Sequence, residues 1–146
     1  MKEKLIKAYM DVAHRFSKLS HAQRLHVGAI IVKDDRIISI GYNGMPAGWD
    51  NNCEDKVWNV NDGDYKLKTK PEVLHAETNA IAKLAKSTNS GKDADIFITH
   101  SPCLDCAKLI YQSGIRRVYF GEHYRDDSGI HFLEKSGVEV KKIDAS

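Results

Sequence analysis

The chain alternates between apolar residues at helical spacing and short runs of β-branched residues. A helix over residues 4–19 is predicted because apolar side chains recur there every three to four positions, at Leu5, Ala8, Tyr9, Val12, Phe16 and Leu19. The same periodicity predicts helices over residues 73–87, 103–114 and 128–137. Gly114 lies where a glycine would cap the third of these helices.

Between the helices, β-branched and aromatic runs predict strands over residues 26–32, 36–43, 94–101, 116–122 and 138–143. Only a short charged turn separates the first two, so they are expected to form an antiparallel hairpin. The later strands alternate with helices, which indicates βαβ crossovers and parallel pairing. The expected fold class is α/β, with one domain over residues 1–146 and a five-stranded mixed sheet covered by helices on both faces.

Two segments lack a clear period. Residues 41–52 are rich in glycine and asparagine and are expected to be a loop. Residues 53–71 are polar, and we expect irregular structure there with room for a short helix. The lysine run at 66–70 within this segment is typical of a solvated loop.

Composition narrows the class of protein. Hydrophobic residues make up 42% of the 146 residues and charged residues 29%, which is typical of a globular chain. No apolar run is long enough to span a membrane, and the N-terminus has acidic residues and a helical repeat unlike a secretory signal. The net charge of +2 comes from scattered lysines, which argues against nucleic acid as a partner. We therefore expect a cytoplasmic protein without membrane or nucleic-acid partners.

Candidate metal ligands occur at the starts of two predicted helices. His75 precedes one helix, and Cys103 and Cys106 form a Cys-x-x-Cys pair at the start of another. A catalytic zinc takes three protein ligands of these types and keeps a fourth position for water. A helix N-terminus also favours thiolates, and Pro102 suits a helix entrance. One catalytic Zn²⁺ per chain is therefore predicted.

A carboxylate accompanies this ligand set. Glu77 follows His75 by two residues, so it can approach the metal and transfer protons without being a ligand. Other interpretations of the cysteines are a redox pair, or a structural zinc with Cys53 or His100 as fourth ligand. The combination of His-x-Glu with Pro-Cys-x-x-Cys is, however, the signature of zinc deaminases.

The segments "HAETNAI" (75–81) and "SPCLDCAKLI" (101–110) resemble the zinc-dependent cytidine deaminase superfamily. "VGAIIV" (27–32) followed by "GYNGMPAG" (41–48) is similar to the deoxycytidylate deaminases, and the likeness extends from about His21 to Val140. This resemblance implies a cytidine-deaminase-like α/β/α fold. It also implies hydrolysis of dCMP to dUMP and ammonia, which supplies dUMP for thymidylate synthesis. The compact length is most like the virus-encoded and bacterial members, so the location would be a bacterial or host cytoplasm.

The resemblance also implies roles for individual residues. Zinc would be held by His75, Cys103 and Cys106, with Glu77 as the proton shuttle. Substrate would be contacted by Arg24, Asn43, Ala76, Ser101, Pro102 and Tyr124. Arg24 could instead be a surface charge, and Tyr124 could be a core residue.

Regulation is implied as well. Members of the family are commonly homohexamers that dCTP activates and dTTP inhibits, with Mg²⁺ accompanying the triphosphate. Gly41, Tyr42, Asn43 and Gly44 would form the allosteric nucleotide site, although a turn could need the same glycines. Some phage members carry a second zinc, which is not expected here because Cys53 has no partner cysteine near His21.

Two rival functions remain at this level. Another zinc deaminase could act on dCTP or on a base in tRNA or single-stranded nucleic acid, but the latter would need a basic rim and aromatic platforms. A non-enzymatic zinc protein would have no need of Glu77.

Overall fold

The computed structural model describes residues 1–124 and 126–144. Its body is a five-stranded sheet in the order β2-β1-β5-β6-β7. The strands are β1 (Gly28–Lys33), β2 (Arg36–Tyr42), β5 (Asp95–His100), β6 (Arg117–Glu122) and β7 (Glu139–Lys142). β1 runs antiparallel to both of its neighbours, while β5, β6 and β7 are parallel. The predicted mixed sheet and the predicted hairpin are both confirmed.

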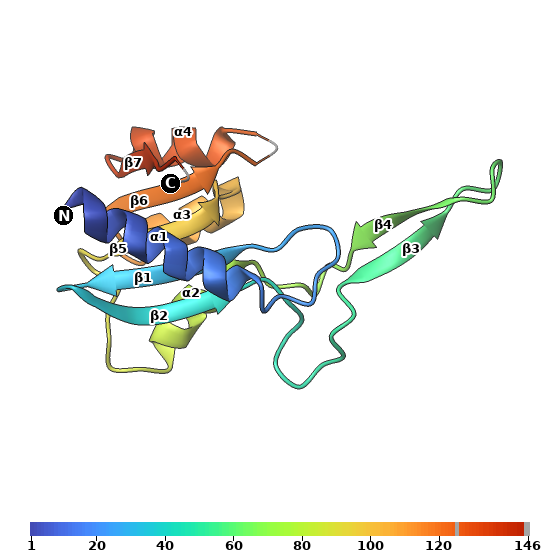
Figure 1. The fold of residues 1–146 in the computed structure, drawn as a ribbon, viewed down its shortest axis with the longest axis horizontal. Coiled ribbons are helices and arrows are strands. Elements are labelled where there is room, and N and C mark those ends of the chain that lie inside the picture. The colour runs from blue at the N-terminus through green and yellow to red at the C-terminus, as the bar shows by residue number, and fades with distance from the viewer. Residues whose placement is uncertain (125, 145–146) are drawn as a thin grey trace.

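Helices cover both faces of the sheet, as expected (Figure 1). They are α1 (Glu3–Ser17), α2 (Ala76–Ala85), α3 (Leu104–Gln112) and α4 (Ser128–Lys135). α1 lies alone on one face, where Ile6 and Met10 pack with Ile30 and Phe97. The other three helices cover the opposite face. There the core contains Ala29, Ile31, Ala76, Ala80, Ile96, Ile98, Ala107, Ile110 and Leu133.

Alternation along the central strands explains the three layers. Successive side chains of a strand point to opposite faces, so Ile30 and Ile31 of β1 enter different cores. β1 and β5 are buried at almost every position because helices cover both of their faces. Gly114, with φ of +87°, follows the C-cap Ser113 of α3, as the sequence predicted.

The prediction for residues 53–71 is wrong. β3 (Glu54–Trp58) and β4 (Tyr65–Thr69) form a separate two-stranded antiparallel sheet, and the lysine run lies largely in β4. We call residues 54–69 the arm, because Figure 1 shows it projecting from the body. Apart from Glu54 and the half-buried Leu67, its strand residues are exposed. The sequence lacked a buried face here, and with it the signal that distinguishes a strand from a loop.

A smaller difference concerns the predicted loop at 41–52. β2 continues through Gly41 and Tyr42, so the loop begins at Asn43. In the described ranges, no helix combines the length and apolar character needed to cross a bilayer.

Candidate metal and substrate site

The three predicted ligands meet where α2 and α3 begin. His75 is the N-cap residue of α2 and Cys103 that of α3, while Cys106 lies in the first turn of α3. His75 Nδ1 lies 3.6 Å from Cys103 Sγ and 3.3 Å from Cys106 Sγ. Tetrahedral zinc with ordinary Zn–S and Zn–N distances would place sulfur and nitrogen about 3.6 Å apart. The ligand atoms therefore have the spacing that a zinc ion requires.

The electrostatics of the ligands favour a cation. Hydrogen bonding with Cys106 and His75 lowers the pKa of the Cys103 thiol to about 4. The same pairing with Cys103, together with burial, raises the pKa of Cys106, since two adjacent thiolates repel each other. A divalent ion between the sulfurs would remove that repulsion and keep both deprotonated. In the described part of the chain, no fourth His, Cys, Asp or Glu belongs to this group, which leaves Cys53 and His100 outside it.

Glu77 lies beside the ligands in the first turn of α2 and is only 4% exposed. Burial raises the pKa of its carboxyl group to about 7, against the opposing effects of its own backbone N–H and of His75. A carboxyl group with such a pKa can both accept and donate a proton near neutral pH. This is the property that a general acid–base residue needs.

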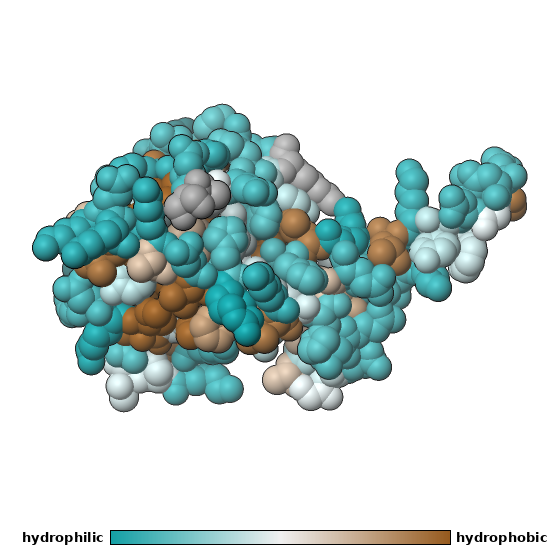
Figure 2. Space-filling view, viewed as in Figure 1, coloured by the Kyte–Doolittle hydropathy of each residue, from teal (hydrophilic) through white to brown (hydrophobic). Residues whose placement is uncertain are grey.

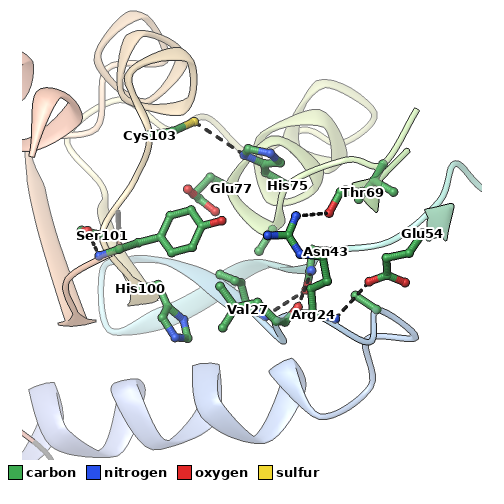
Figure 3. A pocket seen from close by; sticks show the side chains of 15 residues that line it. Arg24, Val27, Asn43, Glu54, Thr69, His75, Glu77, His100, Ser101 and Cys103 are labelled. Carbon is green, nitrogen blue, oxygen red and sulfur yellow. Dashed lines mark hydrogen bonds between the residues drawn. The ribbon is translucent and has the colours of Figure 1, made fainter. Parts of the chain in front are cut away.

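A cavity of about 280 Å³ opens beside the ligands. Five of the six predicted substrate residues line it, namely Arg24, Asn43, Ala76, Ser101 and Tyr124. Pro102 is fully buried and does not belong to the lining. Of the predicted allosteric residues, Asn43 alone is part of the cavity wall. Figure 3 shows Cys103, His75 and Glu77 toward one side and Arg24, Asn43, Thr69 and Glu54 toward the other.

An irregular segment, residues 22–27, forms one wall of the cavity and is held from two sides. Asn43 accepts a hydrogen bond from Val27 N (2.9 Å) and donates one to Leu25 O (2.8 Å). Glu54 accepts hydrogen bonds from the backbone of Gln23 (2.8 Å) and Arg24 (3.0 Å). The wall is thus fixed by side chains that are distant in sequence.

The opposite wall contains the end of β5 and the residues after β6. Ser101 Oγ accepts a hydrogen bond from Tyr124 N at 2.8 Å, which fixes where the tyrosine leaves the sheet. His100 Nδ1 lies 2.9 Å from Thr99 Oγ1, and burial lowers the pKa of its imidazole. Tyr124 lies on the cavity rather than in either core cluster.

The remaining predicted allosteric residues have distinct surroundings. A Cβ at Gly41 would lie 2.3 Å from Ala76 O, so this glycine allows α2 to contact the backbone of β2. The Tyr42 carbonyl accepts a hydrogen bond from Asn79 Nδ2 (2.8 Å) of α2. Gly44 pairs with Leu74 through a backbone bridge and has open space around it.

Sequence reasoning missed several lining residues, among them Glu54, Thr69 and His100 as a wall residue. His100 directly precedes the Ser-Pro-Cys motif at the end of a strand, so a strand-end argument could have included it. Glu54 and Thr69 reach the cavity only because the arm pairs them in register, and an isolated sequence gives no such signal.

Comparison with known proteins agrees with this geometry. A family model described as the cytidine and deoxycytidylate deaminase zinc-binding region matches residues 3–122. The ComE operon protein 2 of Bacillus subtilis is 38% identical over 137 residues, covering 93% of this chain and 69% of that protein. Deoxycytidylate deaminase of phage T4 is 33% identical over 168 aligned positions, covering 92% of this chain and 87% of that one.

A solved structure is similar over almost its whole length. The dCMP deaminase of cyanophage S-TIM5, crystallised with dCMP and dUMP, superposes with a TM-score of 0.86 at 44% identity. The match covers 98% of this chain and 99% of that one, so the likeness extends over nearly the whole of both chains.

Proposed function

The chain belongs to the cytidine and deoxycytidylate deaminase zinc-binding family, and we propose that it hydrolyses dCMP to dUMP and ammonia, supplying dUMP for thymidylate synthesis. The observation that carries the proposal is the position of buried Glu77 beside the ligand group His75, Cys103 and Cys106. Glu77, His75 and Cys103 line one cavity. The T4 and cyanophage S-TIM5 relatives are themselves dCMP deaminases.

Zinc fits the ligand set by donor type and by spacing. His75, Cys103 and Cys106 would hold one ion, and the two thiolates would offset much of its charge. Bound zinc supplies the Lewis acidity that lets water deprotonate near neutral pH. The remaining chemistry falls to side chains of the protein.

Glu77 is the proton carrier of the proposal. Conversion of cytosine to uracil adds water at C4 and releases the amino group as ammonia. The added water therefore supplies two protons: one goes to N3, where it remains in uracil, and the other goes to the departing nitrogen. A single carboxyl group with a pKa near 7 can collect and deliver both.

The substrate would lie with its base near Glu77 and its phosphate toward Arg24. Ala76, Ser101 and Tyr124 supply the wall on the base side, with Pro102 packed behind. Asn43 lies beside Arg24, and its amide donates one hydrogen to Leu25 O, so its second amide hydrogen could bind the sugar. Arg24 is exposed at the other side, where a guanidinium can pair with a phosphate.

The test is the ultraviolet absorbance change of dCMP during incubation with purified protein. Deoxycytidine and dCTP serve as comparison substrates, and Glu77→Ala is the control for contaminating activity. Turnover of dCMP in preference to the other two is expected. Absence of dCMP turnover by zinc-loaded protein would refute the proposal.

Regulation by dCTP as activator and dTTP as inhibitor is a further part of the proposal, with Mg²⁺ neutralising the triphosphate. Within the 41–44 segment, Asn43 lines the cavity, whereas Gly41, Tyr42 and Gly44 do not. The position of these three residues outside the substrate cavity supports a separate effector site. Tyr42 is partly exposed and offers a stacking face. Tyr42→Ala should weaken the response to each triphosphate more than basal turnover in dCMP titrations. Identical hyperbolic curves for the wild type with and without effectors would remove the regulatory claim.

We also propose a homo-oligomer, with a hexamer as the expected size, in the cytoplasm of a bacterium or host cell. The arm supports association because Val57, Trp58, Val60 and Tyr65 are exposed on it. Figure 2 shows the arm standing away from the body, mostly hydrophilic but with apolar surface at its tip. A two-stranded hairpin is only marginally stable without a packing partner. Light scattering with size-exclusion chromatography measures the mass directly, and a monomer at working concentration would contradict the proposal.

A further inference from the structure

Glu54 is a buried carboxylate at the base of an otherwise exposed arm. It is 4% exposed, whereas the other residues of β3 are all open to solvent. Burying a carboxylate is unfavourable unless specific hydrogen bonds replace its water. The bonds that Glu54 makes therefore indicate what it does.

Both hydrogen bonds that this carboxylate accepts come from one short stretch of backbone. Oε2 accepts from Gln23 N at 2.8 Å and from Arg24 N at 3.0 Å. Consecutive backbone N–H groups form a concave site that suits an anion. Oε1 is buried without a hydrogen-bond partner among the described residues. The side chain thus holds the backbone of Arg24 in place through one oxygen.

The strand opposite Glu54 holds the side chain of the same arginine. Glu54 and Thr69 are direct partners across β3 and β4. Thr69 Oγ1 accepts a hydrogen bond from Arg24 Nη1 at 3.3 Å. The base of the arm therefore contacts both the backbone and the guanidinium of Arg24 (Figure 3).

Other parts of the wall do not depend on the arm. Leu25 and Val27 are fixed by Asn43, which follows β2 in the body. Loss of the Glu54 carboxylate would consequently release Gln23 and Arg24 while leaving the later wall residues held. The zinc ligands lie on α2 and α3 and would be unaffected.

We propose that Glu54 is a positioning residue that presents Arg24 to the phosphate of the substrate, so that the base of the arm is part of the substrate site. This inference rests on the proposed function, and in particular on Arg24 as the phosphate contact. Glu54 acts through Arg24 and has no role in the transfer of protons.

Kinetics of four proteins test the proposal: Glu54→Ala, Glu54→Gln, Arg24→Ala and the Glu54→Ala/Arg24→Ala double variant. Glu54→Ala should raise KM for dCMP by about tenfold or more with kcat little changed, since lost positioning weakens binding rather than chemistry. Glu54→Gln should recover most of the loss, because its amide oxygen can accept the same two N–H bonds. The double variant should be no worse than Arg24→Ala alone, because the two residues act as one unit.

Thr69→Val gives an independent check, because Thr69 is exposed and its replacement leaves Glu54 in place. Thr69→Val should raise KM for dCMP by less than Glu54→Ala does. In a chain that also carries Arg24→Ala, it should cause no additional rise. Zinc content and thermal midpoint accompany each measurement. Additive effects, an unchanged KM for Glu54→Ala, or a fall in kcat with zinc content would each overturn the proposal. Failure of the proposed function would be seen differently, as a wild type that does not deaminate dCMP.

Discussion

Gly41→Ala is expected to damage the site by displacing α2 from the sheet. The added Cβ would lie 2.3 Å from Ala76 O and 2.6 Å from Ala80 N, where real Cβ contacts stay beyond 3.0 Å. The helix must therefore move by at least 0.7 Å at its closest point. Both clashing atoms are backbone, so no side-chain rotation can relieve the overlap. His75 and Glu77 lie at the start of the same helix and would move with it.

The loss in the free energy of unfolding of Gly41→Ala comes from overpacking and from two weakened hydrogen bonds. Overpacking a tight contact costs about 1–3 kcal/mol. Displacement of α2 also stretches the bonds from Ser39 Oγ to Ala80 O (2.6 Å) and from Asn79 Nδ2 to Tyr42 O (2.8 Å). Each such bond contributes about 1 kcal/mol. If both bonds are lost, a total loss of about 3–5 kcal/mol is expected. Each kcal/mol lowers the thermal midpoint of a chain of this size by about 2–4 °C.

Thermal unfolding followed by circular dichroism, with zinc analysis and dCMP turnover, measures the effect. Gly44→Ala is the matched control, because nothing lies within 4 Å of its added Cβ and its bridge to Leu74 uses only backbone atoms. That variant should keep the stability and zinc content of the wild type. A Gly41→Ala protein with an unchanged midpoint and full activity would refute the packing argument.

Three other predictions concern the site. Cys103→Ser should lose zinc and unfold more readily, since a hydroxyl replaces one of three ligands, and metal analysis after dialysis checks this. Glu77→Ala should keep zinc, yet lose turnover by a factor of about a hundred to ten thousand, as measured by dCMP absorbance. A rate near that of the wild type would exclude the proton-carrier role. Burial lowers the pKa of His100 from its ordinary 6.5 in the folded chain, so below pH 6.5 the unfolded chain binds an additional proton and the free energy of unfolding falls. His100→Asn should make urea unfolding less dependent on pH as the pH falls below 6.5, and equal slopes for both proteins would contradict the assignment.

The parts of the fold that the sequence predicted are those with a buried face. α1 and the strands of the sheet have apolar residues at regular intervals because a core selects them. The arm lacks such selection. In β4, Tyr65, Leu67 and Thr69 alternate with lysines, but most of both faces is exposed and the pattern resembles a charged loop. The residues of β4 do alternate with a period of two, but neither face of the strand is apolar enough for this alternation to predict a strand.

The site divides in the same way. His75, Cys103 and Cys106 could be predicted because zinc chemistry restricts residue type and spacing within short motifs. Glu54 and Thr69 contribute through pairing across the arm and through contacts with a segment about thirty residues earlier, as for Glu54 and Arg24. The sequence resemblance predicted Gly41 as part of a nucleotide site. The structure adds a packing role for this glycine, because α2 approaches the backbone of β2 there.

The assembly of the cavity from distant segments has a consequence for folding kinetics and local opening. The turn of the arm pairs Trp58 with Tyr65, a contact that a hairpin can form within microseconds. The contacts around the cavity instead join residues that are distant in sequence. Arg24 and Glu54 are 30 positions apart, and the ligands His75 and Cys103 are 28 positions apart. Such contacts close longer loops than the arm hairpin does, so the cavity wall should form after that hairpin. The amides of Gln23 and Arg24 should exchange hydrogen through local openings, while those of β1 and β5 exchange only with global unfolding. Hydrogen exchange at these two amides would then report the opening of the substrate wall while the core stays folded.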